Sequence, residues 1–386
     1  MLQGFFVLFC SLQPLLNESL RMAYSHVPIF FMLALFLTYS GTDCLVYNIL
    51  LSPSDPCPTQ PCLTLSQFAS DTSSYLQSNT TLIFQPGNHS LGSKLRVVGI
   101  LSLQFLKSIL PLSANIICEN SSFDLYNITF IHISRLQFIG CSGNRGESIG
   151  QLSIKDTNFL GQEKSKTALE LVRTSAVIEK CSFTSNMIGN LKTICLQRSK
   201  CQTVRAGGAV ALTQSNIILI GNTFKQNSAE VGGAIFSERN TKITIINSIF
   251  ERNHATSQSN DTDCYGGALY CQSGCTVTIR NSNFNNNTAI RDQELDTKKV
   301  YAGGAIAIVK GVTVDVSESK ISNNTAAGDG GAIYVWESTV NINKSEFNNN
   351  MAGRYGGALH AERLSVTSVM SITESEFINN KANDGK

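Results

Sequence analysis

Five acidic residues in two long linkers are the residues whose type and spacing suggest a chemical task. They lie in segments 254–265 and 288–302 and are Asp261, Asp263, Asp292, Glu294 and Asp296. Carboxylate oxygens are ligands that Ca²⁺ prefers, and carboxylates crowded together repel one another unless a cation lies among them. If folding joins the two segments, they predict a calcium site of about millimolar affinity. The alternative interpretation is a pair of ordinary solvated loops.

Residues for acid–base or nucleophilic catalysis are sparse elsewhere in the sequence. His89, His132, His254 and His360 are far apart in the chain and are interpreted as surface or turn residues. No Ser-His-Asp or Cys-His arrangement stands in a recognisable context. We therefore expect a protein without enzymatic activity and without a cofactor, calcium being the one possible bound ion.

A repeat must position these linkers. Six copies open with Gly-Gly-Ala and an aliphatic residue, and their first glycines are Gly207, Gly232, Gly266, Gly303, Gly330 and Gly356. Each copy continues to a Phe-x-x-Asn motif, in which Ile321 once replaces the phenylalanine; the phenylalanines are Phe224, Phe250, Phe284, Phe347 and Phe377. The motif asparagines are Asn227, Asn253, Asn287, Asn324, Asn350 and Asn380. Self-similarity at this period predicts a solenoid.

The spacing within each copy selects β-structure. The residues seven and five positions before the motif phenylalanine are aliphatic, for example Val340 and Ile342 before Phe347. Alternation with period two predicts short strands with one buried face. Coils of about 25 residues with two or three such strands predict an all-β, right-handed parallel β-helix of about ten coils. Phenylalanines would then stack inside, asparagines would form a ladder, and Gly-Gly would supply left-handed or closely approaching backbone.

The joint recurrence of the two motifs resembles a known group of proteins. Gly-Gly-Ala-aliphatic and Phe-x-x-Asn repeats are similar to those of the chlamydial polymorphic outer-membrane proteins and of secreted, pectin-lyase-like β-helix proteins of sponges and other simple animals. The resemblance covers roughly residues 120–386 and implies a pectin-lyase-like β-helix; the chlamydial group implies adhesion. Enzymes of sugar polymers also use this fold, so a polysaccharide lyase or hydrolase is the alternative function. The clustered Asp pairs, Gly-His-Gly and Arg-Ile-Lys of polygalacturonases are missing.

The chain divides into three predicted segments. Residues 1–44, with an apolar run at 29–37 and a possible alternative start at Met22, predict a signal peptide. Residues 45–111 are expected to form an N-terminal cap, stapled by a disulfide, and the first strands. Residues 112–386 hold the repeats and stop where another Gly-Gly-Ala would begin, which predicts a truncated C-terminus. Membrane contact is expected only through a leader retained as an anchor or through a missing C-terminal segment.

Cysteines and glycosylation sequons indicate the compartment. Of twelve cysteines, ten follow the leader; plausible local disulfides are Cys57–Cys62, Cys195–Cys201 and one bond within Cys264, Cys271 and Cys275. Eight Asn-x-Ser/Thr sequons lie beyond the leader, at Asn79, Asn88, Asn120, Asn127, Asn260, Asn286, Asn323 and Asn343. Together with the leader they predict a glycosylated, secreted or cell-surface protein.

Charge and linker lengths restrict the partners. The net charge is +2 and 15% of residues are charged, without a basic run, so a nucleic-acid partner is not expected. The linkers 187–206, 254–265 and 288–302 are longer than the others and leave the same corner of the predicted solenoid, and insertions on one face often mark the functional face. Tyr265, Tyr270, Tyr301, Tyr334 and Trp336 are expected to be exposed near them. These features predict a non-catalytic, adhesin-like interaction or structural module with an extracellular glycan or protein ligand.

Overall fold

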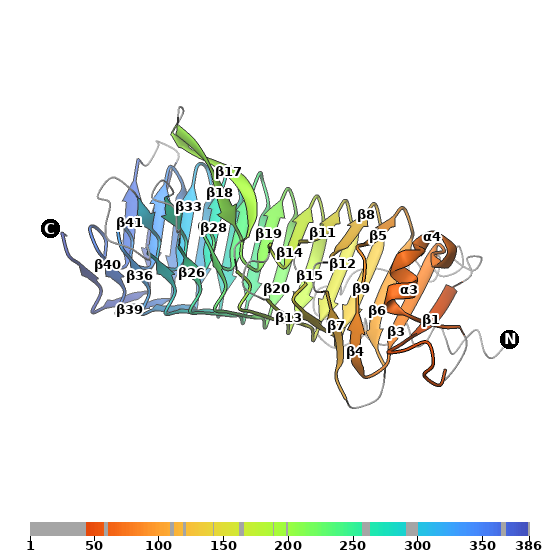
Figure 1. The fold of residues 1–386 in the computed structure, drawn as a ribbon. Helices are drawn as coiled ribbons and strands as arrows, with labels where there is room; N and C mark the ends of the chain where they lie inside the picture. Colours follow the sequence, from red (N-terminus) through yellow and green to blue (C-terminus); the bar gives the residue numbers. More distant parts are fainter. Residues whose placement is uncertain are drawn as a thin grey trace, which may run out of the picture. The chain divides into compact units, whose positions relative to one another are not determined.

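The computed structural model describes residues 44–57, 61–108, 112–118, 121–141, 143–161, 166–187, 189–197, 200–256, 263–290, 300–363 and 368–384. Strands follow one another through these residues (Figure 1). The described helices are two short ones near residue 70, α3 (Leu65–Ser70) and α4 (Thr72–Tyr75). No helix in the described part of the chain has the length and hydrophobicity to cross a membrane.

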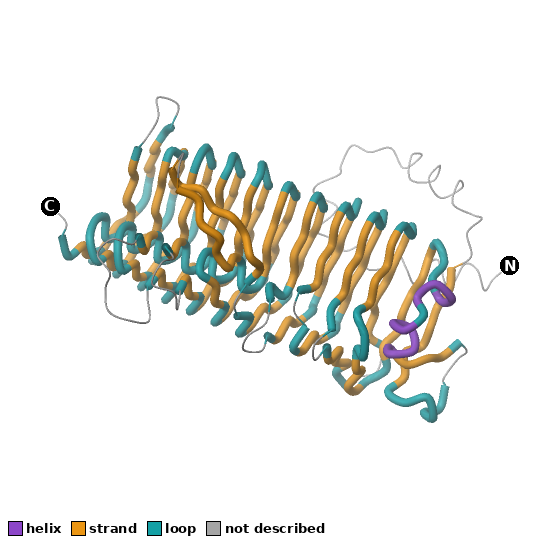
Figure 2. The backbone as a smooth tube through the Cα atoms, turned by 45° about the horizontal axis from the view of Figure 1, so that its top comes forward, coloured by secondary structure: helices purple, strands orange, loops and turns teal. Residues whose placement is uncertain are grey.

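Three long parallel sheets build the described part of residues 44–384, and from β3 onward successive turns of the chain add one strand to each (Figure 2). The described strands of sheet A are, in chain order, β1 (Cys44–Leu50), β2 (Cys62–Thr64), β3 (Asn79–Phe84), β6 (Ser102–Lys107), β9 (Phe130–Ser134), β12 (Gln151–Lys155), β15 (Ser175–Glu179), β20 (Asn216–Ile220), β24 (Lys242–Ile246), β29 (Thr276–Arg280), β34 (Thr313–Ser317), β38 (Thr339–Asn343) and β42 (Met370–Thr373). Those of sheet B are β4 (Gly87–Ser90), β7 (Ala114–Ile117), β10 (Gln137–Ile139), β13 (Asn158–Leu160), β16 (Ser182–Thr184), β21 (Thr223–Lys225), β25 (Ile249–Glu251), β30 (Asn283–Asn285), β35 (Lys320–Ser322), β39 (Glu346–Asn348) and β43 (Glu376–Ile378). Those of sheet C are β5 (Leu95–Val98), β8 (Phe123–Tyr126), β11 (Asn144–Glu147), β14 (Leu169–Val172), β19 (Val210–Thr213), β23 (Ile235–Glu238), β28 (Leu269–Gln272), β33 (Ile306–Val309), β37 (Ile333–Trp336) and β41 (Leu359–Glu362).

Three smaller sets of strands complete the coils. The two-residue strands between sheets B and C form sheet D, which consists of β22 (Ser228–Ala229), β26 (His254–Ala255), β31 (Thr288–Ala289), β36 (Thr325–Ala326), β40 (Met351–Ala352) and β44 (Lys381–Ala382). Strand β27 (Cys264–Tyr265) pairs with β32 (Tyr301–Ala302), and β17 (Asn190–Gln197) forms an antiparallel hairpin with β18 (Lys200–Ala206). The predicted parallel β-helix is confirmed. Strands β1, β3 and β6 pair in register within the segment expected to hold the cap and the first strands.

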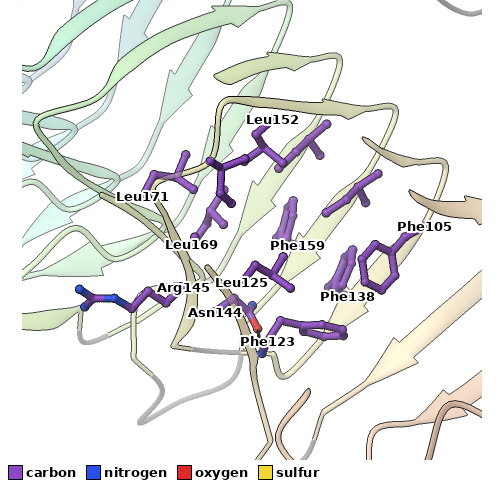
Figure 3. A pocket seen from close by; sticks show the side chains of 14 residues that line it. Phe105, Phe123, Leu125, Phe138, Asn144, Arg145, Leu152, Phe159, Leu169 and Leu171 are labelled. Atoms are coloured by element: carbon purple, nitrogen blue, oxygen red, sulfur yellow. Dashed lines mark hydrogen bonds between the residues drawn. The ribbon is translucent and has the colours of Figure 1, made fainter. Parts of the chain in front are cut away.

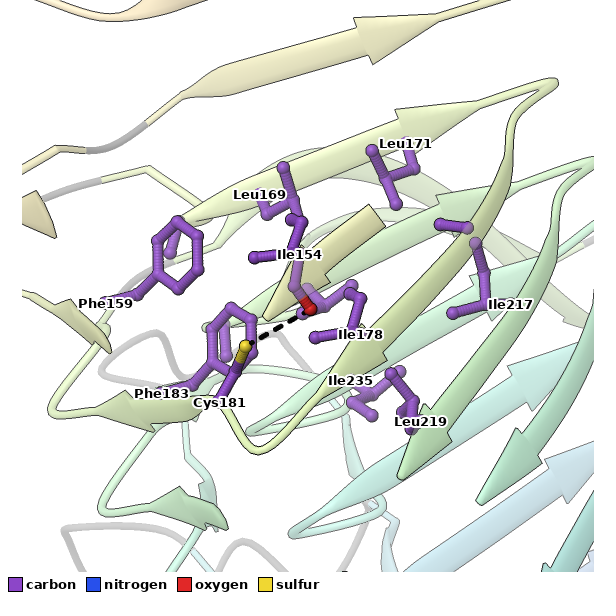
Figure 4. Packing of buried hydrophobic residues seen from close by; sticks show 14 of the residues in the cluster. Ile154, Phe159, Leu169, Leu171, Ile178, Cys181, Phe183, Ile217, Leu219 and Ile235 are labelled. Atoms are coloured by element: carbon purple, nitrogen blue, oxygen red, sulfur yellow. Dashed lines mark hydrogen bonds between the residues drawn. The ribbon is translucent and has the colours of Figure 1, made fainter. Parts of the chain in front are cut away.

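The core is a column of equivalent side chains from successive coils. Phe224, Phe250 and Phe284 are opposite one another in sheet B, with ring centroids 4.7 and 4.4 Å apart and nearly parallel planes. Aliphatic pairs from sheet A, such as Ile217 and Leu219, belong to the same core cluster, which Figure 4 shows in the part that holds Phe159 and Phe183. The stack is interrupted at Ile321 and resumes with Phe347 and Phe377. Stacked rings and aliphatic side chains fill the interior with little space for water.

Asparagine and glycine shape the corners of each coil. Both the backbone N–H and the side-chain amide of Asn253 donate to Oδ1 of Asn287, each at 3.0 Å, and the same pattern recurs from Asn186 to Asn380. At Gly207, φ is +65°, in the left-handed region. A Cβ on the following Gly208 would lie 2.4 Å from the carbonyl oxygen of Gly233, so the next coil leaves no space for a side chain there.

Candidate recognition surface

The bases of the two acidic linkers lie side by side. Cys264 and Tyr265 pair with Tyr301 and Ala302. Asp263 is buried and its Oδ1 accepts a hydrogen bond of 3.0 Å from the backbone N–H of Val300, which ties one linker to the other. Asp261, Asp292, Glu294 and Asp296 lie outside the described residues. Within the described ranges no three metal-ligating side chains gather, so the calcium site stays a prediction.

The outer face of sheet C carries the largest departures from a plain solenoid. The first and third residues of each strand point into the core, as Ile333 and Val335 do in β37. The second and fourth lie on the outer face, where Tyr334 and Trp336 belong to a separate hydrophobic cluster. From β19 to β37 all four residues of every strand are buried. This part of sheet C is therefore covered on both faces.

The first long linker forms the cover at one end of this cluster. Its hairpin, β17–β18, lies across the outer face of sheet C (Figures 1 and 2). Val204 and Ala206 of β18 pack in the cluster that contains Phe236, Tyr265 and Tyr270. The sequence singled out this linker only by its length, and the structure shows that it forms a docked hairpin.

An ion-pair network joins the hairpin to strands β14 and β23 of sheet C. Nζ of Lys192 in β17 lies 2.9 Å from Oε1 of Glu170 and 3.9 Å from Oε1 of Glu238. Thr213 donates to the same Glu238 oxygen at 3.1 Å. All three charged side chains are largely buried, with 8 to 16% of their surface exposed. In such surroundings an ion pair is screened little by solvent.

The aromatic residues expected to be exposed are instead buried. The exposed fraction is at most 6% for each of Tyr265, Tyr270, Tyr301, Tyr334 and Trp336. Tyr301 packs in a small cluster with Ala255 and Cys264, whereas the other four share the outer cluster of sheet C. The prediction of exposure was wrong because side chains pack over the outer face of sheet C and around the β27–β32 pair.

Paired charges occupy the N-terminal part of the same face. Arg145 lies 2.8 Å from Glu147 and 3.1 Å from Glu170, and Arg173 also pairs with Glu147. The hydrogen bond from Arg145 lowers the pKa of the Glu147 carboxyl below its usual value. A general acid in catalysis needs the opposite shift, a pKa raised toward neutrality. The lowered pKa of Glu147 favours its anionic form, which pairs with both arginines.

A row of aromatic rings lies at the C-terminal end of the outer face of sheet C. We call Tyr334, Trp336, Tyr355 and His360 the aromatic corner. The His360 ring lies between the Tyr334 ring at 5.9 Å and the Tyr355 ring at 6.0 Å, centroid to centroid. Half of Tyr355 is exposed, at 49%. Burial and the nearby Glu362 carboxylate, which accepts a hydrogen bond from the Tyr334 hydroxyl at 3.3 Å, raise the Tyr334 pKa.

Four charged side chains surround the aromatic corner. Nη2 of Arg354 lies 2.5 Å from Oδ2 of Asp329, and the guanidinium carbon of Arg363 lies 5.1 Å from the centre of the Trp336 ring. Nε of Arg363 is 3.9 Å from Oε1 of Glu362. Aromatic rings beside planar, hydrogen-bonding side chains form a surface that can hold a ligand with both apolar and polar faces.

The histidines do not form a catalytic group. His89 lies in the core with Nε2 2.6 Å from the carbonyl oxygen of Gln85, and burial lowers its pKa. His132 is buried on sheet A with Nδ1 3.1 Å from Oγ of Ser153, and burial lowers its pKa too. These two are buried in strands and are not the surface or turn residues that the sequence predicted. His254 lies in β26 and His360 in β41, so the four occupy different sheets.

The cysteines agree with the predictions only in part. The Cys57–Cys62 disulfide is present, and a second disulfide, Cys118–Cys141, joins two neighbouring coils. Cys271 and Cys275 are buried free thiols, so the predicted bond within that group is absent. Cys181 is also a buried free thiol; its sulfur lies 3.6 Å from the Ile154 carbonyl oxygen (Figure 4), and burial raises its pKa to about 12.

The backbone also places the remaining cysteine pair and the sequons. The hairpin register sets Cys195 opposite Cys201. Of the sequon asparagines, four are exposed and two are half-buried; the exposed ones are Asn88, Asn127, Asn286 and Asn323, and the half-buried ones are Asn79 and Asn343. Asn120 and Asn260 lie outside the described residues. Glycosylation stays a prediction.

An internal cavity of about 30 Å³ lies in the core beside β11 (Figure 3). Gly146 occupies an inward position there, opposite Leu125 and Leu171. The Asn144 amide at its edge is satisfied, because Oδ1 accepts from the Phe123 N–H at 3.0 Å and Nδ2 donates to the Ala168 carbonyl at 2.8 Å. A cavity of one-water size with an apolar lining is expected to stay dry and is a packing gap.

The repeat has a counterpart among known families. A model of the Chlamydia polymorphic membrane protein repeat matches residues 318–335 and 344–362, which contain two Gly-Gly-Ala starts and the motifs ending at Asn324 and Asn350. The repeats of this chain resemble those of that family. A search of curated proteins finds no match.

Two solved structures are distantly similar. A Geobacillus virus E2 protein, ORF18, is 13% identical with a TM-score of 0.34; the alignment covers 78% of this chain and 54% of that one. The chain thus spans about half the length of that structure. A mannuronic acid specific polysaccharide family 6 lyase from human gut microbiota is 9% identical with a TM-score of 0.23, covering 78% of this chain and 87% of the lyase.

Proposed function

We propose that this chain is a non-catalytic, adhesin-like interaction module displayed at the cell surface or secreted. The observation that carries the proposal is the outer face of sheet C, where a docked hairpin, an ion-pair network and an aromatic corner gather on a regular scaffold. A solenoid needs none of these to stack its coils. Rigid scaffolds that present additional loops and side chains on one face commonly use that face for binding.

Three observations support an extracellular location. The matched repeat is that of a membrane protein family. The disulfides Cys57–Cys62 and Cys118–Cys141 are typical of oxidising compartments. Four sequon asparagines are exposed on the described surface, where a glycan could be attached.

A carbohydrate-active enzyme is the competing function. A glycoside hydrolase uses a carboxyl group with a raised pKa near a second carboxylate. On the outer face of sheet C, Glu147 instead has a lowered pKa and two arginine partners. The expected partner is therefore an extracellular glycan or protein that is bound without turnover.

The test is binding of the secreted, glycosylated chain to animal cells and to extracellular matrix, measured by flow cytometry and a plate assay. One variant replaces three exposed arginines along sheet C by Ala: Arg96, Arg173 and Arg363. The matched control replaces three exposed residues of sheet A: Lys242, Thr276 and Arg280. We expect the sheet C variant to lose at least tenfold in apparent affinity and the control to bind like the parent. Equal losses in both, no binding by the parent, or turnover of a polysaccharide would overturn the proposal.

A further inference from the structure

We propose that the corner where sheet A turns into sheet B is an interface at which two copies of this chain pair side by side in opposite directions. The inference goes beyond the proposed interaction function and does not rest on it. Two features carry it: the order of the charges along one column of exposed turn residues, and an exposed aliphatic patch at the centre of that order.

Each coil places one turn residue at this corner. All of these residues are exposed and have a left-handed backbone, with φ between 44° and 63°. The N–H of each donates to a carbonyl oxygen of the next coil, as Lys180 does to Ile220 at 2.9 Å. Successive members therefore follow one another at the strand spacing of about 4.8 Å. We call them the turn column, which in chain order consists of Asp156, Lys180, Gly221, Asn247, Asn281, Glu318 and Lys344.

The charges of the turn column are opposite in sign on the two sides of Asn247. Lys180 lies two coils before Asn247 and Glu318 two coils after it; Asp156 lies three coils before and Lys344 three coils after. A two-fold axis through Asn247 that sets two copies antiparallel would place Lys180 against Glu318 of the second copy, and Asp156 against its Lys344. A two-fold interface makes every such contact twice, so each kind of ion pair forms on both sides of the axis.

Other arrangements of the two copies bring like charges together. A shift of one coil in one direction sets Asp156 against Glu318, and a shift in the other direction sets Lys180 against Lys344. If the two copies were parallel, every charge would face its own equivalent. The turn column thus favours one orientation and one register. Complementary charges usually contribute such specificity more than affinity.

The charges of the turn column are poorly compensated within one copy. Asp156 and Glu318 have no ion-pair partner among the described residues. Lys180 lies 3.6 Å from Glu179 but 63% of its side chain is exposed, and Lys344 pairs only with an equally exposed glutamate. These four side chains are therefore available to a second copy.

The centre of the turn column is apolar. Ile249, the first residue of β25, is 45% exposed, and the half-buried Ile220 and Ile246 end the neighbouring strands β20 and β24. The two-fold would bring the two copies of this patch together inside the ion pairs, which is the usual arrangement of an apolar centre and a polar rim. A contact of this size is small, so we expect a dissociation constant in the micromolar range.

The interface uses only coils that have a described coil on both sides. Asp156 follows β12, between β9 and β15, and Lys344 follows β38, between β34 and β42. It is formed by sheets A and B alone, so pairing leaves the outer face of sheet C uncovered. The predicted glycan on Asn343 would lie beside Lys344, and the test therefore uses Asn343→Gln as its reference chain.

Sedimentation equilibrium of the full reference chain at low ionic strength, from about 1 µM to about 200 µM, tests the inference. We expect a monomer–dimer equilibrium. Lys180→Glu and Glu318→Lys should each weaken it at least tenfold, because each turns ion pairs into like-charge contacts. An equal mixture of these two variants should recover the affinity of the reference, since each copy then offers the other an opposite charge. The matched control is Lys242→Glu, an exposed cation at the far end of β24.

Ile249→Ser tests the apolar centre and should also weaken the dimer at least tenfold. Circular dichroism melts confirm that every variant is folded. The inference is wrong if the reference chain stays monomeric, if the variants of Lys180 and Glu318 associate no more weakly than Lys242→Glu, or if their mixture fails to recover. Loss of the dimer with unchanged binding to cells would show that the two functions are separate.

Discussion

Lys192 and Glu170 meet across two parts of the chain that the repeat alone would keep apart. The ammonium group comes from the hairpin inserted before Gly207, and the carboxylate comes from β14 of the solenoid, 2.9 Å away. The pair thus fastens an insertion to the outer face of sheet C. Its removal tests how firmly the hairpin is attached.

Lys192→Met is predicted to loosen the hairpin and to lower the free energy of unfolding by about 1.5–3 kcal/mol, the usual value of a hydrogen bond to a charged group. Hydrogen exchange of the amides of residues 190–206 should accelerate before that of sheet A. The control is Lys225→Met, whose pair with Glu251 is more exposed and should cost about 0–1 kcal/mol. Equal effects of the two substitutions would contradict this role.

Phe284→Ala is predicted to destabilise by about 3–5 kcal/mol, because it opens a gap in the ring stack between Phe250 and Ile321. Asn287→Ala should cost about 1–3 kcal/mol, since the N–H and Nδ2 of Asn253 lose their acceptor. Asn285→Ala, in the half-exposed position between them, serves as the control. Chemical denaturation measures the free energy of unfolding of all three variants. If Phe284→Ala and Asn287→Ala leave it unchanged, neither side chain lies in the core of the solenoid.

Gly146→Ala is predicted to stabilise by about 0.4–1 kcal/mol, because it restricts the unfolded chain and fills part of the cavity. The new Cβ would approach Ile149 Cδ1 and Leu171 Cδ2 to 3.0 Å, and both are ends of flexible side chains. Gly208→Ala should have the opposite sign, because backbone atoms of three other residues crowd that position. Thermal melts that shift in the same direction for both variants would refute this account.

Lowering the pH should destabilise the folded N-terminal coils, because His89 is buried there. Burial lowers its pKa in the folded protein below the usual 6.5, so the unfolded chain takes up a proton first. The stability that neutral His89 contributes is complete above pH 6.5. Its loss starts as the pH falls past 6.5 and is complete below the folded pKa. Urea unfolding between pH 7.5 and 4.5 should therefore be less pH-dependent in His89→Gln, and an unchanged slope would disprove the link.

Calcium is the remaining prediction from the two acidic linkers. If the site forms, millimolar calcium should raise the melting temperature of the parent and leave an Asp261→Asn, Asp292→Asn double variant unaffected. Asp263 is retained in that variant because its Oδ1 already accepts from the Val300 N–H. If the parent melts at the same temperature with and without calcium, the predicted calcium site is wrong and the linkers are ordinary solvated loops.

The repeat predicts the solenoid well because equivalent side chains occupy equivalent surroundings in every coil. Phe250 and Asn253 are placed by neighbours that are copies of themselves, so local spacing is enough. The outer face of sheet C obeys a different rule. Its strand Ile333–Trp336 is apolar at every position, a pattern typical of strands buried on both faces, and this signal could have corrected the expected exposure of Tyr334 and Trp336.

The hairpin was missed for a similar reason. Cys195 and Cys201 flank the polar residues 197–200, which is a hairpin signal independent of the parallel repeat. The Cys118–Cys141 disulfide could not be derived, because its partners lie in coils where the motif is degenerate and the pairing depends on the stacking register.

The coil-by-coil stacking also determines how the molecule would respond to mechanical tension. Each coil contacts mainly its two neighbours, so a pulling force can peel coils away one at a time and release length in steps. The Cys118–Cys141 bond closes a loop with a sequence separation of 23 and removes that length from the extension. Under load the N-terminal coils would thus extend less, while the coils with the Phe-x-x-Asn motif unfold one after another.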